Sequence, residues 1–524
     1  MALLPASVAA ANPALVAAAA LALFVVYTLV RTWRSPLRRI PGTKLSLFTP
    51  AALRWHELRG ERTRYVHSLH TAYGPVVRLA PSEVSFSSAA AVKEIYNTAG
   101  SGYDKTDFYN LFTVYGRRTM FTTLGKEQHA RRRRILADRY ANTNIMRGPS
   151  LAGIEERARY FVDLCTAAPG GVLDIYMALH AYAFDCVTHH LFHPYGADSL
   201  RKESDAAIMR EVTFDDSLQN RLISWYSPKL YAAADRIIAL FTVPRETPLS
   251  NNFVLDTSAR PDTDHFTLTA RMHEKRQDYE DGPPSLADEE SRGPPQKPGF
   301  DLLDAAAESL DHMAAGIDTT GDALCFLMYE LSLPRSLPFQ ARLRRELREN
   351  KDVAFDRLPF LDAVVTEGLR CFPAIPMSLP RLVPSTHWGT RSTNSVQSGQ
   401  DGRVIDGFFV PAGTVVSSQA YSVHRMNDSV FPDPDAFNPD RWLVSDGDAD
   451  RRRSFFAFAS GGRGCIGKHL ALVEMKLLLR DVYSRFATTP EESMTPASMI
   501  MSDQLISSRP RGQQCLLHFD PIEA

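Results

Sequence analysis

The chain has 524 residues, of which 44% are hydrophobic and 23% charged, and its formal net charge is −1. This composition is typical of a globular protein with a large buried core. The neutral balance argues against a nucleic-acid-binding protein, which usually carries a basic excess. Six cysteines are scattered without the paired spacing of a disulfide framework or a zinc site, which fits a reducing compartment.

The first predicted element is an apolar segment, residues 14–30, that contains no charged side chain. With the apolar residues before it, this segment is long enough to cross a bilayer. A cleavable signal peptide carries its positive charges before the apolar run, whereas here the cations follow it. The bias of cations toward the cytosol then predicts a single anchor with a lumenal N-terminus; the alternative is a buried core helix. The cations are Arg31, Arg34, Arg38 and Arg39.

Residues 32–46 mix proline, glycine and arginine, which indicates a stiff basic linker. It suits anionic lipid headgroups, or it is a plain solvated connection. We therefore expect an anchor over residues 1–31, this linker, and one catalytic domain over residues 47–524.

Short helices and strands come next. Two strands are expected in residues 73–88, on either side of a turn at Pro81. A later helix begins with His129 and four arginines, and His129 and Arg133 share one face because they are four residues apart. On its own this pattern also fits a solvated basic face.

A long helix is predicted over residues 300–333, and its centre reads Ala-Gly-Ile-Asp-Thr-Thr. Gly316 and two threonines weaken a helix interior. Asp318 in an apolar span needs a partner or a function, and the Thr319 hydroxyl can bond a carbonyl one turn earlier. Small residues with threonine are also common in plain packing.

A second helix, ending at Cys371, holds Glu367 and Arg370 on one face, a spacing that also fits a surface ion pair. Dense prolines then favour an extended edge that ends at Arg381. Residues 405–416 alternate around a Pro-Ala-Gly turn and are predicted to form a hairpin.

Cys465 lies among four glycines within seven residues, directly before another apolar helix. The glycines let the backbone approach a flat bound group. The unpaired N–H groups and the positive dipole end of the helix favour the thiolate form of the cysteine, which is the form that binds metals. Arg463 places a fixed cation beside the site, suited to a carboxylate. A lone cysteine is otherwise most often an inert buried residue.

The run Phe458-x-x-Gly461-x-Arg463-x-Cys465-x-Gly467 resembles the haem-binding loop of the cytochrome P-450 family of haem-thiolate monooxygenases. The other segments are similar to that family's motifs and occur in its order. The resemblance implies a mainly α fold with a smaller β lobe, carried here behind one N-terminal transmembrane helix.

The resemblance also assigns roles to individual residues. Cys465 is expected to ligate the haem iron, and Phe458 to pack on the thiolate side of the ring. Asp318 and Thr319 are expected to support oxygen activation, Asp318 as a proton relay. The residues expected to bind haem propionates are Arg133, Arg381 and Arg463, with His129 where the family commonly has tryptophan.

A structural network is implied as well, in which Glu367 and Arg370 are joined by Arg441 from the segment Phe-Asn-Pro-Asp-Arg-Trp. A buried network of this kind is costly to break. It would hold the core around the cysteine loop and take no part in the chemistry.

The expected function is insertion of one oxygen atom from dioxygen into a lipophilic small molecule. Electrons would come from an NADPH-dependent cytochrome reductase at the endoplasmic reticulum membrane. The chain looks like microsomal members from filamentous fungi, which often act in secondary-metabolite biosynthesis. The alternatives are a haem-thiolate isomerase or dehydratase, a membrane-anchored binding protein without catalysis, and a cysteine hydrolase.

Overall fold

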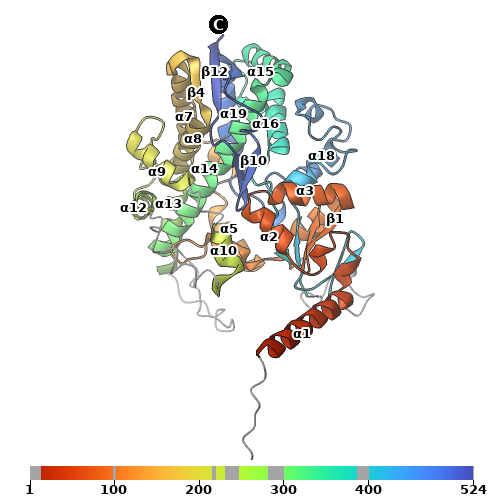
Figure 1. Cartoon of the computed structure of the whole chain (residues 1–524). Coiled ribbons are helices and arrows are strands. Elements are labelled where there is room, and N and C mark those ends of the chain that lie inside the picture. Colours follow the sequence, from red (N-terminus) through yellow and green to blue (C-terminus); the bar gives the residue numbers. More distant parts are fainter. Residues whose placement is uncertain are drawn as a thin grey trace, which may run out of the picture.

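A computed structural model describes residues 13–97, 102–214, 220–229, 247–280, 300–385 and 401–522. Helices dominate it (Figure 1). In the N-terminal half they are α1 (Pro13–Arg34), α2 (Ala51–Leu58), α3 (Arg62–Tyr73), α4 (Ala89–Val92), α5 (Lys126–Leu136), α6 (Asn142–Ile145), α7 (Gly148–Ala167), α8 (Ile175–Phe192), α9 (Glu203–Thr213), α10 (Asn220–Tyr226), α12 (Pro248–Ser258) and α13 (Leu268–Glu280).

The C-terminal half carries the longest helix, α14, which the others surround (Figure 1). Its helices are α14 (Leu302–Ser332), α15 (Leu337–Glu349), α16 (Pro359–Cys371), α17 (Ala420–Val423), α18 (Asp448–Ser454) and α19 (Lys468–Tyr483). Three short helical turns also matter to the site: η4 (Asp107–Phe112), η8 (Pro439–Trp442) and η9 (Gly461–Arg463).

The strands in the described part of the chain form four small sheets. The largest has the order β1-β2-β8-β5-β3, and the second has the order β4-β12-β9; β6 pairs with β7, and β10 pairs with β11. The strands are β1 (Val76–Ala80), β2 (Glu83–Phe86), β3 (Asp104–Lys105), β4 (Val172–Asp174), β5 (Arg381–Leu382), β6 (Gly402–Ile405), β7 (Phe408–Pro411), β8 (Val415–Ser417), β9 (Phe486–Pro490), β10 (Met501–Gln504), β11 (Ser507–Pro510) and β12 (Leu516–Pro521).

The main core lies where α14 packs against α8, and two glycines of α14 allow the close approach. A Cβ atom added to Gly316 would lie 2.7 Å from Val187, and one added to Gly321 would lie 3.0 Å from the His180 ring. Asp301 starts the helix, because its side chain accepts a hydrogen bond from the backbone N–H of Asp304 (2.7 Å). Because helices dominate the described residues and the sheets are small, the expected mainly α fold with a smaller β part is correct.

The hairpin expected over residues 405–416 is only partly correct. β6 and β7 do form a hairpin, but it turns at Asp406 and Gly407, both of which have positive φ angles. The Pro-Ala-Gly turn instead leads β8 away into the large sheet, where β8 pairs with β2 and β5. Alternation along a strand does not reveal which strand will be its neighbour.

α1 projects from the folded body, and its segment Val16–Arg34 has a mean hydropathy of 1.8 and no buried residues (Figure 1). The alternative of a buried core helix is therefore wrong, and the helix is long and apolar enough to be a membrane anchor. The linker after it is held on the domain. Arg78 of β1 donates hydrogen bonds to the carbonyl oxygens of Leu37 (3.0 Å), Ile40 (2.5 Å) and Thr43 (3.2 Å).

Candidate active site

The cysteine loop is a tight turn closed by its own backbone. The N–H of Cys465 donates to the carbonyl oxygen of Phe458 (2.9 Å), and the N–H of Gly464 donates to that of Gly461 (3.0 Å). Gly461 has φ +71°, and a Cβ atom there would lie 2.0 Å from the carbonyl oxygen of Tyr96. Only glycine fits this position, so the loop is fixed against the segment that follows α4.

The Cys465 thiol is accessible although protein groups surround it. All six cysteines lie in the described residues, and Cys465 alone is exposed. Burial is nonetheless the main influence on its thiol and raises its pKa, whereas the N–H groups of Gly467 and Lys468 lower it. The helix N-terminus therefore acts on the sulfur as the sequence predicts, but burial outweighs this effect.

The three predicted arginines come together from three chain segments. Arg133 of α5 donates to a carbonyl oxygen of the cysteine loop (2.7 Å), and Arg381 of β5 donates to the Tyr109 hydroxyl (2.9 Å). Arg463 of η9 contacts the Asp104 carboxylate (3.0 Å), but its Nε and Nη1 atoms are buried without a hydrogen-bond partner. Buried guanidinium nitrogens rarely stay unpaired.

A fourth cation, Lys105, was missed by the sequence analysis. It lies directly opposite Arg381 in the β3–β5 register, is 5% exposed, and donates to the carbonyl oxygen of Phe121 (2.5 Å). Burial pushes its pKa well below the ordinary lysine value, and the nearby arginines lower it further. Nothing local in the sequence marks this lysine, because only the strand pairing places it there.

His129 lies among the same four cations. It is 3% exposed, and burial together with these charges lowers its pKa to about 2, so the ring is neutral. It can therefore donate a hydrogen bond but cannot add a charge. Phe458 is partly buried against the core, with its ring next to Phe455 (6.5 Å between centroids) and below the Lys468 ammonium (5.8 Å).

This arrangement fits haem. Like charges placed opposite one another destabilise a strand pair, and buried cations need partners. Among the described residues, Asp104 is the one carboxylate within 4.0 Å of any of the four cations. Two propionates would supply the missing negative charge, with Cys465 as a ligand of the type that haem-thiolate iron requires.

One residue at the centre of α14 is exposed. It is Ala315, whose neighbours Ala314 and Gly316 are half-buried, and the Thr319 hydroxyl donates to the Ala315 carbonyl oxygen (2.7 Å). This is the backward bond that the sequence predicts. Asp318 precedes Thr319, and burial raises the pKa of its carboxyl to about 7. The helix therefore carries, at adjacent positions, a hydroxyl and a carboxyl that titrates near neutral pH.

The Glu367 network forms as expected, deep in the core. Glu367 and Arg370 are fully buried, and two guanidinium nitrogens of Arg370 donate to the carboxylate (both 2.8 Å). Arg441 of η8 donates to the same carboxylate (3.0 Å), as does the Trp442 indole (2.8 Å). Trp442 was not predicted as a member. The network joins α16 to the segment that precedes the cysteine loop.

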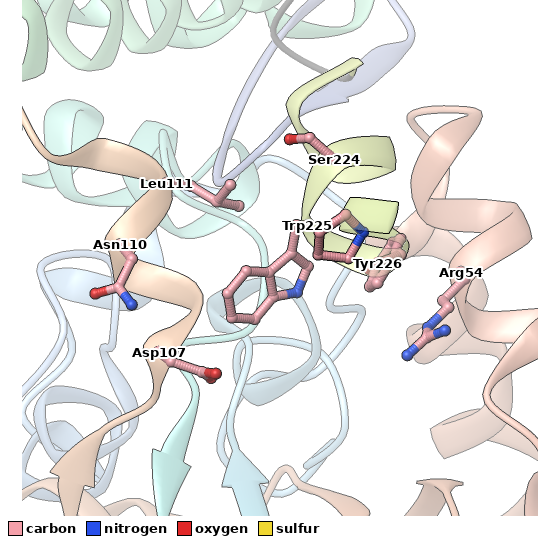
Figure 2. A pocket seen from close by; sticks show the side chains of 8 residues that line it. Arg54, Asp107, Asn110, Leu111, Ser224, Trp225 and Tyr226 are labelled. Atoms are coloured by element: carbon pink, nitrogen blue, oxygen red, sulfur yellow. The ribbon is translucent and has the colours of Figure 1, made fainter. Parts of the chain in front are cut away.

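A separate cavity of about 530 Å³ opens between α2, η4 and α10 (Figure 2). Trp225 and Tyr226 of α10 line one side, and Arg54 of α2 lies over the Tyr226 ring (4.4 Å). No residue of the cysteine loop or of α14 lines this cavity, so it is distinct from the site at Cys465. Its full lining is Arg54, Asp107, Asn110, Leu111, Ser224, Trp225, Tyr226 and Pro228.

Comparison with known proteins gives one consistent result. The sequence pattern of the cytochrome P450 family matches residues 41–516. The chain is similar to the cytochrome P450 monooxygenase orf2 of Aspergillus niger, with 27% identity over 95% of this chain and 96% of that protein. It is also similar to the monooxygenase tazI of Aspergillus terreus (28% identity, 95% and 96%) and to stcB of Emericella nidulans (29% identity, 92% and 88%).

Proposed function

Since this chain belongs to the cytochrome P450 family, we propose that it inserts one atom of dioxygen into a lipophilic small molecule and reduces the other atom to water. The observation that carries the proposal is the exposed Cys465 thiol together with a cluster of four cations, one of which, Arg133, donates to the cysteine loop. This set of groups suits iron protoporphyrin. Haem, when bound, would supply the redox chemistry that splits dioxygen.

The chain's own residues would hold the cofactor and deliver protons. Arg133, Arg381 and Arg463 would bind the propionates, with Lys105 as a fourth cation and His129 as a neutral donor. Two protons are consumed for each oxygen inserted. Asp318, with a pKa of about 7, would hold a proton at its carboxyl and pass it toward the Thr319 hydroxyl.

An apolar wall supports a lipophilic substrate. Phe108, Tyr109, Phe112 and Phe121 form a chain of edge-to-face rings, with centroids between 5.2 and 5.8 Å apart. The Lys105 ammonium lies over the rings of Tyr109 (4.7 Å) and Phe121 (4.8 Å), so this wall adjoins the cation cluster. Aromatic surface favours apolar ligands. The fungal proteins that resemble the chain are cytochrome P450 monooxygenases, and a role in secondary-metabolite biosynthesis is the finer part of this proposal.

The proposed location is the endoplasmic reticulum membrane, with the N-terminus in the lumen and the catalytic domain in the cytosol. Arginines follow the apolar helix, and Arg38 lies over the exposed ring of Trp33 (4.8 Å), a pairing suited to the headgroup layer. Helix α5 packs on the cysteine loop and exposes Arg131 and Arg134. These charges would contact an acidic surface of an NADPH-dependent reductase.

The proposal is tested by isotope labelling. Microsomes that contain the protein and a cytochrome reductase are supplied with NADPH, ¹⁸O₂ and a panel of lipophilic compounds. The proposal predicts a product with one ¹⁸O atom and a lower yield for Thr319→Ala, with hydrogen peroxide released instead. Turnover to an isomerised or dehydrated product without label would favour the isomerase alternative.

A further inference from the structure

A second acid lies one turn beyond Asp318. Asp322 is 2% exposed, and it shares a helix face with Asp318 because the two are four residues apart. Burial raises the pKa of Asp322 well above its ordinary value, and the charge of Asp318 raises it further. The family resemblance assigns no role to this residue. Helix α14 packs on α8 in the middle of the folded body (Figure 1), and Asp322 faces His180 of α8.

His180 of α8 shows which group carries the proton. Its Nδ1 lies 2.6 Å from the carbonyl oxygen of Tyr176, so this nitrogen must be the donor, and Nε2 is left as an acceptor. Burial lowers the pKa of His180 to about 4, so the ring is neutral. Its Nε2 faces the Oδ1 atom of Asp322 at 3.7 Å. A protonated carboxyl is the form of Asp322 that can donate toward this acceptor.

The polar atoms around Asp318 and Asp322 have unused hydrogen-bonding capacity that ordered water could satisfy. Four buried atoms in this region have no hydrogen-bond partner: Asp318 Oδ1, Asp322 Oδ1, His180 Nε2 and the hydroxyl oxygen of Thr213 on α9, which lies beside Asp318. Buried polar atoms in proteins nearly always bond to protein or to ordered water. A buried water needs two to four polar partners, and these atoms supply them. Ordered water would thus connect the two carboxyls.

We propose that Asp322, held by His180, is a proton reservoir that refills Asp318 through ordered water. This assignment rests on the proposed function. When Asp318 gives its proton toward Thr319, the O–H of Asp322 passes a proton to water, and that water passes one to Asp318. Asp322 then takes a proton from solvent through the half-buried edge at Arg509 of β11.

Arg509 explains how the intermediate charge is tolerated. Its guanidinium favours the ionised forms of both Asp318 and Asp322 and the neutral form of His180, so it lies near all three. It donates to Gln513 (2.9 Å), and a guanidinium has hydrogen-bond donors but no acceptor. It therefore stabilises the transient Asp322 carboxylate without transferring a proton. The phenol of Tyr176 also faces this group of charges.

The first test reads the proton directly. The infrared difference spectrum of wild type minus Asp322→Asn, taken at neutral pH on the haem-loaded protein, is expected to contain one protonated-carboxyl band. In His180→Gln that band is expected to shift, because its hydrogen-bond partner changes. No such band in the first difference would show that Asp322 is ionised, and it would overturn the proposal whatever the activity.

The second test reads proton delivery without any substrate. Oxygen uptake is measured with the reductase and NADPH in H₂O and in D₂O. In Asp322→Asn we expect proton-limited turnover to fall about tenfold or more, the peroxide share to rise, and the solvent isotope effect to grow. Asp304→Asn, at the start of the same helix and 4.0 Å from Arg117, is the matched control and is expected to match wild type.

The outcomes separate the two proposals. A wild-type protein that binds no haem ends the proposed function. A normal haem-thiolate spectrum in Asp322→Asn, with unchanged isotope effect and peroxide share, ends the reservoir assignment alone. If Asp322→Asn does not fold, the difference spectrum of wild type minus His180→Gln decides the matter, since a spectrum without any shifted protonated-carboxyl band would contradict the pairing.

Discussion

Replacing Glu367 by glutamine removes the negative charge and one of the two acceptor oxygens on which five N–H donors converge. Two come from Arg370, and one each from Arg441, Trp442 and the backbone of Asn438, at 2.8 to 3.0 Å. The positive groups on Arg370 and Arg441 favour ionisation, and they hold the pKa of Glu367 below its usual value although burial opposes them. The amide would carry no charge and would turn an N–H₂ group toward donors.

The expected loss of unfolding free energy in Glu367→Gln follows from the burial of the charged groups. Removing one partner of a buried ion pair typically costs about 3–5 kcal/mol, because the other charge stays buried without compensation. Arg370 is fully buried, so the upper part of that range is expected. Glu330→Gln is a matched control on α14, because its partner Arg335 has a side chain that is 69% exposed. Water can solvate that arginine, so although Glu330 itself is buried, a smaller loss than that of Glu367→Gln is expected.

The assay is urea unfolding of the micelle-solubilised protein, followed by far-ultraviolet circular dichroism and by the haem absorbance. Glu367→Gln should lower the midpoint strongly and release haem early, whereas Glu330→Gln should lower the midpoint less. Equal midpoints for the two variants would refute the view that this network holds the core around the cysteine loop.

Three further predictions concern the site and its helix. Lys105→Met should weaken haem binding by about 1.5–3 kcal/mol, which is a roughly ten- to hundredfold faster dissociation of haem. The rate is measured by transfer of haem to apomyoglobin, and the exposed control Lys44→Met should leave it unchanged. Gly316→Val should lower the free energy of unfolding in urea by about 1–3 kcal/mol, because the new side chain would clash with Val187. Adding Val187→Ala should restore part of this loss, and a double variant that is no more stable would show that the clash is with another residue. Because the pKa of Asp318 is about 7, its proton is lost as pH rises. The peroxide share should therefore grow between about pH 6 and 8, and a flat profile would contradict the relay.

Sequence reasoning succeeded where short-range chemistry decides the structure. The α14 motif and the Glu367–Arg370 pair are each set by residues within about one helical turn of one another, and the backbone bonds that close the cysteine loop lie within one short segment. The backward bond of Thr319 is an example, since it joins residues four apart. Family order then supplied the long-range partners, including Arg441, which no local pattern identifies.

Sequence reasoning failed where the pairing of strands decides which residues lie together. Lys105 joins the cation cluster because β3 lies in register with β5, across more than 270 residues of sequence. The turn of the β6–β7 hairpin was misplaced for the same reason, since β8 belongs to another sheet. Asp322 was passed over because a buried carboxyl on a core helix has no signature until its neighbour His180 is known.

The coordination of iron by Cys465 is tested most directly by the reduced carbon monoxide spectrum of the purified protein. The wild type is expected to show the red-shifted Soret band of thiolate-ligated haem, and Cys465→Ala is expected to lose it while the fold is kept. A wild-type protein without bound haem, or a Cys465→Ala protein that keeps the band, would contradict the assignment of Cys465 as the iron ligand.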